Sequence, residues 1–305
     1  MKLLALVLPL VATLTAVDAK LISSRDLDSS CGSSLVSGSW ADHILDSAVE
    51  VEAMMKLGID ALQQTFTTLS PQEQVFQSLL LGSGSALAAN RQAAANFLQT
   101  ALSLAQARAT TGRGRKIWIQ CGESSPTGIG TASDKDAQGN LGTTRYLYNF
   151  IQKRKVPIPA VVAPLVPTVC TGTTRGYIDG FVFVLCPFFW TPSVSAKSRR
   201  VINSANTLSG LETGGFLIKD DSIERIRDLG SFSMLHELMH WATWDTVTDK
   251  YAIADANGYK WTQLIAGSSN SPANTAQLYS FLGFGTKLIR DGYNWDKDGK
   301  ITVAK

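Results

Sequence analysis

The chain is short of several residue types and patterns, and each shortage excludes a class of protein. Only three histidines and four cysteines occur among 305 residues. No two cysteines stand in C-x-x-C spacing, which argues against a structural zinc knuckle. The formal charge of +3 is too small to indicate nucleic acid as a partner. The sequence has no N-x-[ST] sequon, so we do not expect N-glycosylation.

After the first 19 residues, the sequence also lacks an apolar run long enough to span a bilayer. Residues 1–19 read MKLLALVLPLVATLTAVDA, with one basic residue and small side chains at Val17 and Ala19. This pattern is typical of a secretory signal peptide cut after Ala19. We therefore expect a secreted, extracellular protein without a membrane partner. Residues 20–305 contain no repeat and no long linker, and they predict a single domain.

The cysteines are few but even in number, which favours disulfides in an oxidising compartment. Cys31, Cys121, Cys170 and Cys186 allow three connectivities. Cys170 and Cys186 flank a hairpin-like segment, so we predict that they pair and that Cys31 pairs with Cys121.

The pattern of apolar residues changes half-way along the chain. Residues 38–110 repeat apolar side chains at three- and four-residue intervals, and they predict helices, one of which starts at Ser70-Pro71. Short strands are predicted at RKIWIQCG and GYIDGFVFVLCPFFW, and a helix at TRYLYNFIQKRK (residues 144–155). Residues 220–244 predict helix again, with a break near Gly230. The expected fold class is α+β, with a mostly helical N-terminal half and a small mixed β-sheet.

Two of the three histidines lie in SMLHELMHWATWD (residues 233–245), where His236, Glu237 and His240 form H-E-x-x-H. Residues four apart share one face of a helix, so both imidazoles can face one metal ion. Glu237 then stands where it can act on a metal-bound water. Packed helical histidines are common, but a chain with so few histidines favours the metal interpretation, with Zn²⁺ as the ion.

A catalytic zinc ion takes three protein ligands and leaves one position open. Downstream of this motif the sequence has no further glutamate, histidine or cysteine, so a downstream third ligand has to be an aspartate. Asp245 follows His240 too closely to share its helix face. Asp249 and Asp255 both leave room for the chain to return, and three aspartates lie near the terminus.

These residues resemble the aspzincins, the deuterolysin-like secreted fungal zinc endopeptidases. That family combines H-E-x-x-H with a later G-T-x-D-x-x-Y-G-type motif, to which IADANGY (residues 253–259) is similar, with its last pair inverted to Gly258-Tyr259. The alignment favours Asp255 as the third ligand, whereas the usual spacing from the second histidine favours Asp249. FVFVLCPFFW and SPANTAQLYSFL are also similar to family segments.

The resemblance implies a zincin-like domain with H-E-x-x-H on its active-site helix, acting as a monomer on polypeptide substrates. Glu237 would be the general base. Tyr259, or less favourably Tyr251, would donate a hydrogen bond to the developing oxyanion. Residues 181–186 would pair with an extended substrate or serve as a core strand. Because the aspartate motif is altered, the alternative is a secreted binding or effector protein on an inactive zincin scaffold.

Overall fold

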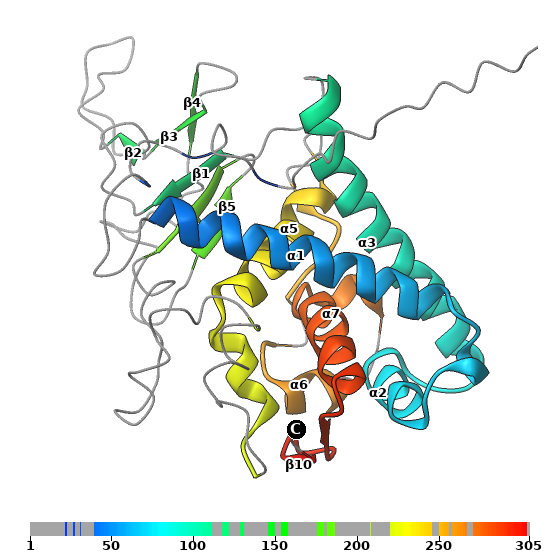
Figure 1. The fold of residues 1–305 in the computed structure, drawn as a ribbon. Coiled ribbons are helices and arrows are strands. Elements are labelled where there is room, and N and C mark those ends of the chain that lie inside the picture. Colours follow the sequence, from blue (N-terminus) through cyan, green and yellow to red (C-terminus); the bar gives the residue numbers. More distant parts are fainter. Residues whose placement is uncertain are drawn as a thin grey trace, which may run out of the picture.

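The computed structural model has an α+β fold in which helices predominate (Figure 1). It describes residues 22, 27, 31, 40–111, 118–121, 129–130, 146–149, 154–157, 176–179, 182–186, 208, 220–245, 250–255, 258–266 and 271–303. The predicted signal peptide lies outside these residues. Within them, no helix combines the length and the apolar character that crossing a bilayer requires.

The α-helices are α1 (Trp40–Gln63), α2 (Pro71–Leu81), α3 (Ser85–Thr111), α5 (Gly230–Thr243), α6 (Trp261–Ala266) and α7 (Gln277–Arg290). The 3-10 helices are η3 (Phe66–Thr68), η6 (Ile223–Asp228) and η7 (Pro272–Asn274). The strands are β1 (Trp118–Cys121), β2 (Ile129–Gly130), β3 (Tyr146–Asn149), β4 (Arg154–Pro157), β5 (Gly176–Asp179), β6 (Val182–Leu185), β7 (Trp244–Asp245), β8 (Lys250–Tyr251), β9 (Asn294–Trp295) and β10 (Ile301–Val303).

Helix α2 begins at the Ser70-Pro71 pair, as the sequence predicts. The Ser70 hydroxyl accepts a hydrogen bond from the Glu73 backbone N–H at 3.2 Å, and the Glu73 carboxylate accepts one from the Ser70 N–H at 3.1 Å. This reciprocal pair is a capping box, and Pro71 occupies the first helical position, where no N–H is needed.

Helices α1, α3, α5 and α7 pack against one another around the main core (Figure 1). Phe232 of α5 contacts Phe281 and Phe284 of α7, with ring centroids 5.1 and 5.4 Å apart. Helix α1 approaches α7 so closely that a Cβ at Gly283 would lie 2.9 Å from both the Cβ and the carbonyl oxygen of Met54. Aromatic packing therefore holds α5 against α7, and the glycine contact brings α7 close to α1.

A mixed sheet of order β1-β6-β5 lies beside the helices (Figure 1). Strand β6 pairs with β1 in parallel and with β5 in antiparallel orientation. Its residues Phe183, Val184 and Leu185 are fully buried. Because β6 is paired on both sides, its backbone cannot receive a substrate strand, so of the two predicted roles for residues 181–186 only the core strand is correct.

The helix predicted over residues 144–155 is wrong. The described part of this segment forms strands β3 and β4, which pair in antiparallel orientation, with Leu147 opposite Val156. Tyr146 and Tyr148 are aromatic residues, which favour strands. In so short a run, periodicity does not distinguish helix from strand, and the pairing partner decides.

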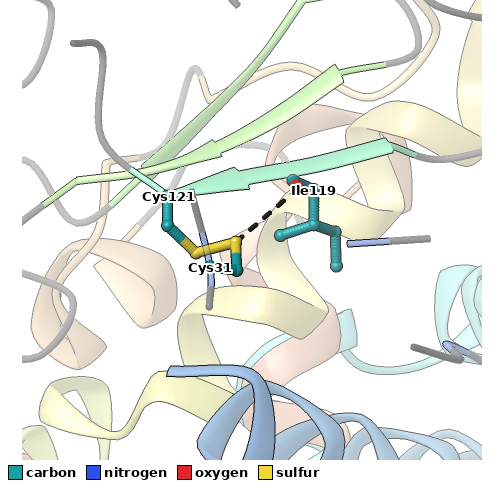
Figure 2. The surroundings of a disulfide bond; sticks show 3 residues. All are labelled: Cys31, Ile119 and Cys121. Atoms are coloured by element: carbon teal, nitrogen blue, oxygen red, sulfur yellow. Dashed lines mark hydrogen bonds between the residues drawn. A yellow bond between two sulfur atoms is a disulfide. The ribbon is translucent and has the colours of Figure 1, made fainter. Parts of the chain in front are cut away.

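Cys31 and Cys121 form a disulfide, as predicted, and it joins the start of the described chain to β1 (Figure 2). The Cys31 Sγ lies 3.7 Å from the carbonyl oxygen of Ile119. Leu27 pairs with Ile119 in a parallel bridge, and Ile22 is buried. Cys186 is also disulfide-bonded. Its predicted partner, Cys170, lies outside the described residues.

Candidate metal centre

Helix α5 presents two histidines on one face. His236 and His240 lie one turn apart, with ring centroids separated by 4.9 Å, and each residue is less than one-tenth exposed. Apolar residues surround them along the helix, since Leu235, Leu238 and Met239 are also buried. The predicted break before this helix is present, because η6 ends at Asp228 and α5 starts at Gly230.

The start of α5 is attached to α1 through a carboxylate. Glu50 of α1 accepts a hydrogen bond from the Ser231 hydroxyl at 2.5 Å. The same carboxylate accepts from the backbone N–H of Leu208, at 2.8 and 2.7 Å to its two oxygens. A negative charge at a helix N-terminus is favourable, because the helix dipole is positive there. Glu50 thus fixes the first turn of the helix that carries both histidines.

Asp255 follows His240 by fifteen residues, and a short hairpin returns the chain to α5. Strands β7 and β8 pair in antiparallel orientation, so the backbone reverses direction after α5 ends. The Ala252 N–H then donates to the Thr243 carbonyl oxygen at 3.1 Å. One residue further on, the Ile253 carbonyl oxygen lies 3.1 Å from Nδ1 of His240. The fifteen-residue spacing between His240 and Asp255 is therefore compatible with a site that both residues share.

Asp255 is also held from the other side, by the segment that leads into α7. It forms an isolated antiparallel bridge with Thr275. The neighbouring Ala254 donates to the Ala273 carbonyl oxygen at 2.9 Å and accepts from the Ala276 N–H at 3.0 Å. The backbone that carries this carboxylate is thus attached both to α5 and to the segment that leads into α7.

The structure brings together the two histidines and one of the two candidate aspartates. Asp255 Oδ2 lies 3.1 Å from Nε2 of His240, and Oδ1 lies 3.6 Å from Nε2 of His236. One ligand atom from each of the three residues lies within 4.8 Å of the others. Asp249 lies outside the described residues. The backbone of Tyr251 belongs to β8, but its side chain is not described.

These three residues fit a zinc ion by their donor chemistry. If Nδ1 of His240 carries the proton and donates it to Ile253, the Nε2 lone pair faces the site. That lone pair and the Asp255 carboxylate would repel each other unless a proton or a cation lay between them. Ligand atoms around tetrahedral zinc lie about 3.3 Å apart, close to the two distances to Asp255.

Two buried polar atoms of this group make no hydrogen bond within the described residues: Asp255 Oδ1 and His236 Nδ1. Buried polar atoms are rarely left without a partner, and an ion is one reason for an exception. An ion would satisfy Asp255 Oδ1 directly. Within the described part of the chain, no outer partner holds His236 Nδ1 as Ile253 holds Nδ1 of His240.

The pKa values in the group reflect burial and mutual charge. Burial alone would lower the pKa of His240, but the hydrogen bond that it donates to Asp255 and the negative charges of Glu237 and Asp255 raise it overall. Burial would raise the pKa of Asp255, yet the close approach of His236 and His240 and their positive charges hold it far below its ordinary value. The metal-free site therefore favours an ionised carboxylate beside a protonated His240.

Glu237 lies beside the metal-ligand face, with Oε1 3.9 Å from Nε2 of His236. Burial raises the pKa of its carboxyl group, the histidine charges lower it, and the Asp255 charge raises it further, with a net increase. A raised pKa makes a carboxylate a stronger base near neutral pH. Glu237 is thus placed and tuned to exchange a proton at this site.

Tyr259 reaches the same group from the loop before α6. Its hydroxyl donates to Asp255 Oδ2 at 3.1 Å, and its ring centroid lies 5.6 Å from that of His236. Burial, and then the charge and hydrogen bond of Asp255, raise the pKa of this phenol, so it stays protonated and can donate. The inverted Gly258-Tyr259 pair therefore does not keep this tyrosine away from the carboxylate.

Two groups that hold the candidate site in place were not predicted from the sequence. The carbonyl oxygen of Ile253 has no side-chain signature. Gln263 accepts hydrogen bonds from the backbone N–H groups of Tyr259 and Lys260, at 3.1 and 3.0 Å. A glutamine at the third position of a helix is a capping signal, and this could have identified Gln263.

Comparisons of this chain with family models, curated proteins and solved structures found no match.

Proposed function

We propose that the protein is a secreted zinc-dependent endopeptidase with an aspzincin-like site on a zincin-like domain. The observation that carries this proposal is the convergence of His236, His240 and Asp255 within 4.8 Å, beside Glu237. Two imidazoles and one carboxylate leave a tetrahedral ion with one open position, as hydrolytic zinc sites require.

Zinc at this position would polarise the scissile carbonyl and lower the pKa of the attacking water. Residues of the chain carry out the proton transfer and hold the ligands. Glu237 takes a proton from the water and passes it to the leaving amine. Asp255 and His240 are held by backbone contacts, so they need little rearrangement to bind the ion.

Tyr259 has the position and protonation state of a donor to a substrate oxygen. The residue is 47% exposed, and its hydroxyl donates to Asp255. A rotation of the ring away from Asp255 would aim the hydroxyl at a carbonyl oxygen bound beside the ion. Such a donor stabilises the charge that develops on that oxygen during hydrolysis.

The test is cleavage of casein by the purified mature chain and by its Glu237→Gln variant. Glutamine keeps the size of the side chain but cannot act as a base. We expect the rate to fall by about 10²–10⁴-fold while the zinc content stays the same. Glu52→Gln makes the same chemical change on α1, where Glu52 pairs with Lys56, and should leave the rate unchanged.

If the wild-type chain holds zinc but neither form cleaves casein or a peptide library, the site serves as a binding scaffold instead. If the wild-type chain holds no zinc, both the enzyme and the metal-bound scaffold are excluded.

A further inference from the structure

The loop between Asp255 and α6 has a conformation that the proposed chemistry does not explain. Gly258 has a φ of 75°, in the left-handed region, and its N–H donates to the Asp255 carbonyl oxygen at 3.3 Å. A Cβ at this position would lie 2.7 Å from Oε1 of Gln263. Both the backbone angle and the contact with Gln263 therefore favour glycine here.

Gln263 holds the same loop from the helix side. Its Oε1 accepts from the N–H groups of Tyr259 and Lys260. Lys260 precedes the first residue of α6, and Gln263 is the third residue, so the contact to Lys260 is one half of a capping box. The second contact extends this cap by one residue, to Tyr259. Because both partners are donors, the amide oxygen must face them.

The place of the Tyr259 side chain depends on these backbone contacts. Nearly half of the side chain is exposed, so packing restrains it weakly. Its hydroxyl nevertheless donates to Asp255 Oδ2, the oxygen that also faces His240. The backbone contacts at Gly258 and Gln263 hold the loop that carries Tyr259, and they account for the position of its hydroxyl.

We propose that Gln263 is a positioning residue: through the backbone of Tyr259 it keeps the phenol hydroxyl on Asp255 and so orients that carboxylate for the metal ion. The inference rests on the proposed zinc site, but not on peptide hydrolysis. Outer partners of metal ligands typically change metal affinity or activity by about 10–100-fold when they are removed. Gln263 touches neither the ion nor the substrate, so its effect must pass through Tyr259.

The experiment is a double-mutant cycle read out as zinc affinity, measured by competition with a chelator on the full mature chain. Gln263→Met keeps the length of the side chain and removes the acceptor. We expect it to weaken zinc binding about tenfold, as much as Tyr259→Phe does. The double variant should bind zinc no more weakly than Tyr259→Phe alone, because both changes remove the same hydrogen bond.

Two further variants separate positioning from general damage to the helix. Gln263→Glu restores an acceptor of the same shape and should bind zinc within about twofold of wild type, a smaller change than the loss of one outer partner. Thr262→Ala changes an exposed neighbour on the same helix and should have no effect. On casein, Gln263→Met should lower kcat while leaving KM nearly unchanged, as expected for a lost transition-state interaction.

The outcomes distinguish this inference from the proposed function. Normal zinc affinity in Gln263→Met, or losses that multiply in the double variant, would overturn the positioning role alone. Coupled losses in a chain that cleaves no peptide would support the positioning role and overturn the peptidase. A wild-type chain without zinc affinity would overturn both.

Discussion

At the scale of single residues, Asp255 has the most demanding position among the residues that the structure describes. Its carboxylate faces two imidazoles and a phenol, and one of its oxygens is buried without a hydrogen bond among the described residues. Burying an ionised carboxylate is costly unless it is paired or binds a metal. Two bonds between backbone segments hold it there, so the fold supports an arrangement that is unfavourable for the isolated side chain.

We predict that Asp255→Ala abolishes stoichiometric zinc binding, because it removes one of three protein ligands. Asp249→Ala is the matched control, since it removes the competing aspartate in the same connection and should leave the zinc content at one ion per chain. Metal analysis of both purified variants gives the answer. The opposite pattern would assign the third ligand to Asp249.

At the scale of elements, the close crossing of α1 and α7 depends on glycines, which have no Cβ at the contact. A Cβ at Gly283 would meet Met54 backbone at 2.9 Å, whereas one at Gly58 would meet the tip of Leu98 at 3.2 Å. We expect Gly283→Ala to lower the free energy of unfolding by about 1–3 kcal/mol through overpacking. Gly58→Ala should cost less, since its contact is with the tip of a side chain instead of backbone and alanine favours the helix. Urea unfolding compares them, and equal losses would contradict this account.

Glu73 joins two elements, because it caps α2 and also pairs with Arg290 of α7 at 2.9 Å. Burial raises the pKa of Glu73, but the hydrogen bonds from Arg290 and Ser70 outweigh it and lower the pKa below 4.5. A lowered folded pKa contributes stability above the unfolded value, and this contribution is lost as the pH falls through the folded value.

Wild type should therefore exceed Glu73→Gln in stability by about 1 kcal/mol at pH 7, and the difference should shrink below pH 4.5. Urea unfolding at several pH values measures the difference. A difference that does not change with pH would show that the charge of Glu73 is not involved.

The elements that the sequence predicted correctly are those with local signals. The Ser70-Pro71 start of α2 and the common face of His236 and His240 follow from helix geometry and capping alone. The sequence predicts a helix where β3 lies, because the periodicity of a short run does not show that β4 pairs with it. The role of Ile253 depends on where a loop returns, which no local pattern encodes, whereas Gln263 has a local signal as the third residue of α6.

At the scale of the whole molecule, the candidate site joins distant parts of the chain. Glu50 in α1 fixes the start of α5, and the segment before α7 fixes Asp255. These contacts place the N-terminal helices and the C-terminal third around the same three ligands. None of the three ligands belongs to the N-terminal helices, so loosening the N-terminal half is expected to reduce stability before it changes the ligand residues themselves.

The Cys31–Cys121 disulfide offers a test of whether the N-terminal half can lose stability without a change at the ligand residues. It closes a loop of 90 residues that includes α1, α2 and α3 but none of the three proposed ligands. Restricting an unfolded loop of this size stabilises the folded chain by about 4.6 kcal/mol. We expect the double variant Cys31→Ser, Cys121→Ser to lose about that much in urea unfolding while it binds zinc with unchanged affinity under native conditions. A loss of zinc affinity that matches the loss of stability would mean that the ligands and the N-terminal helices do not behave as separable parts.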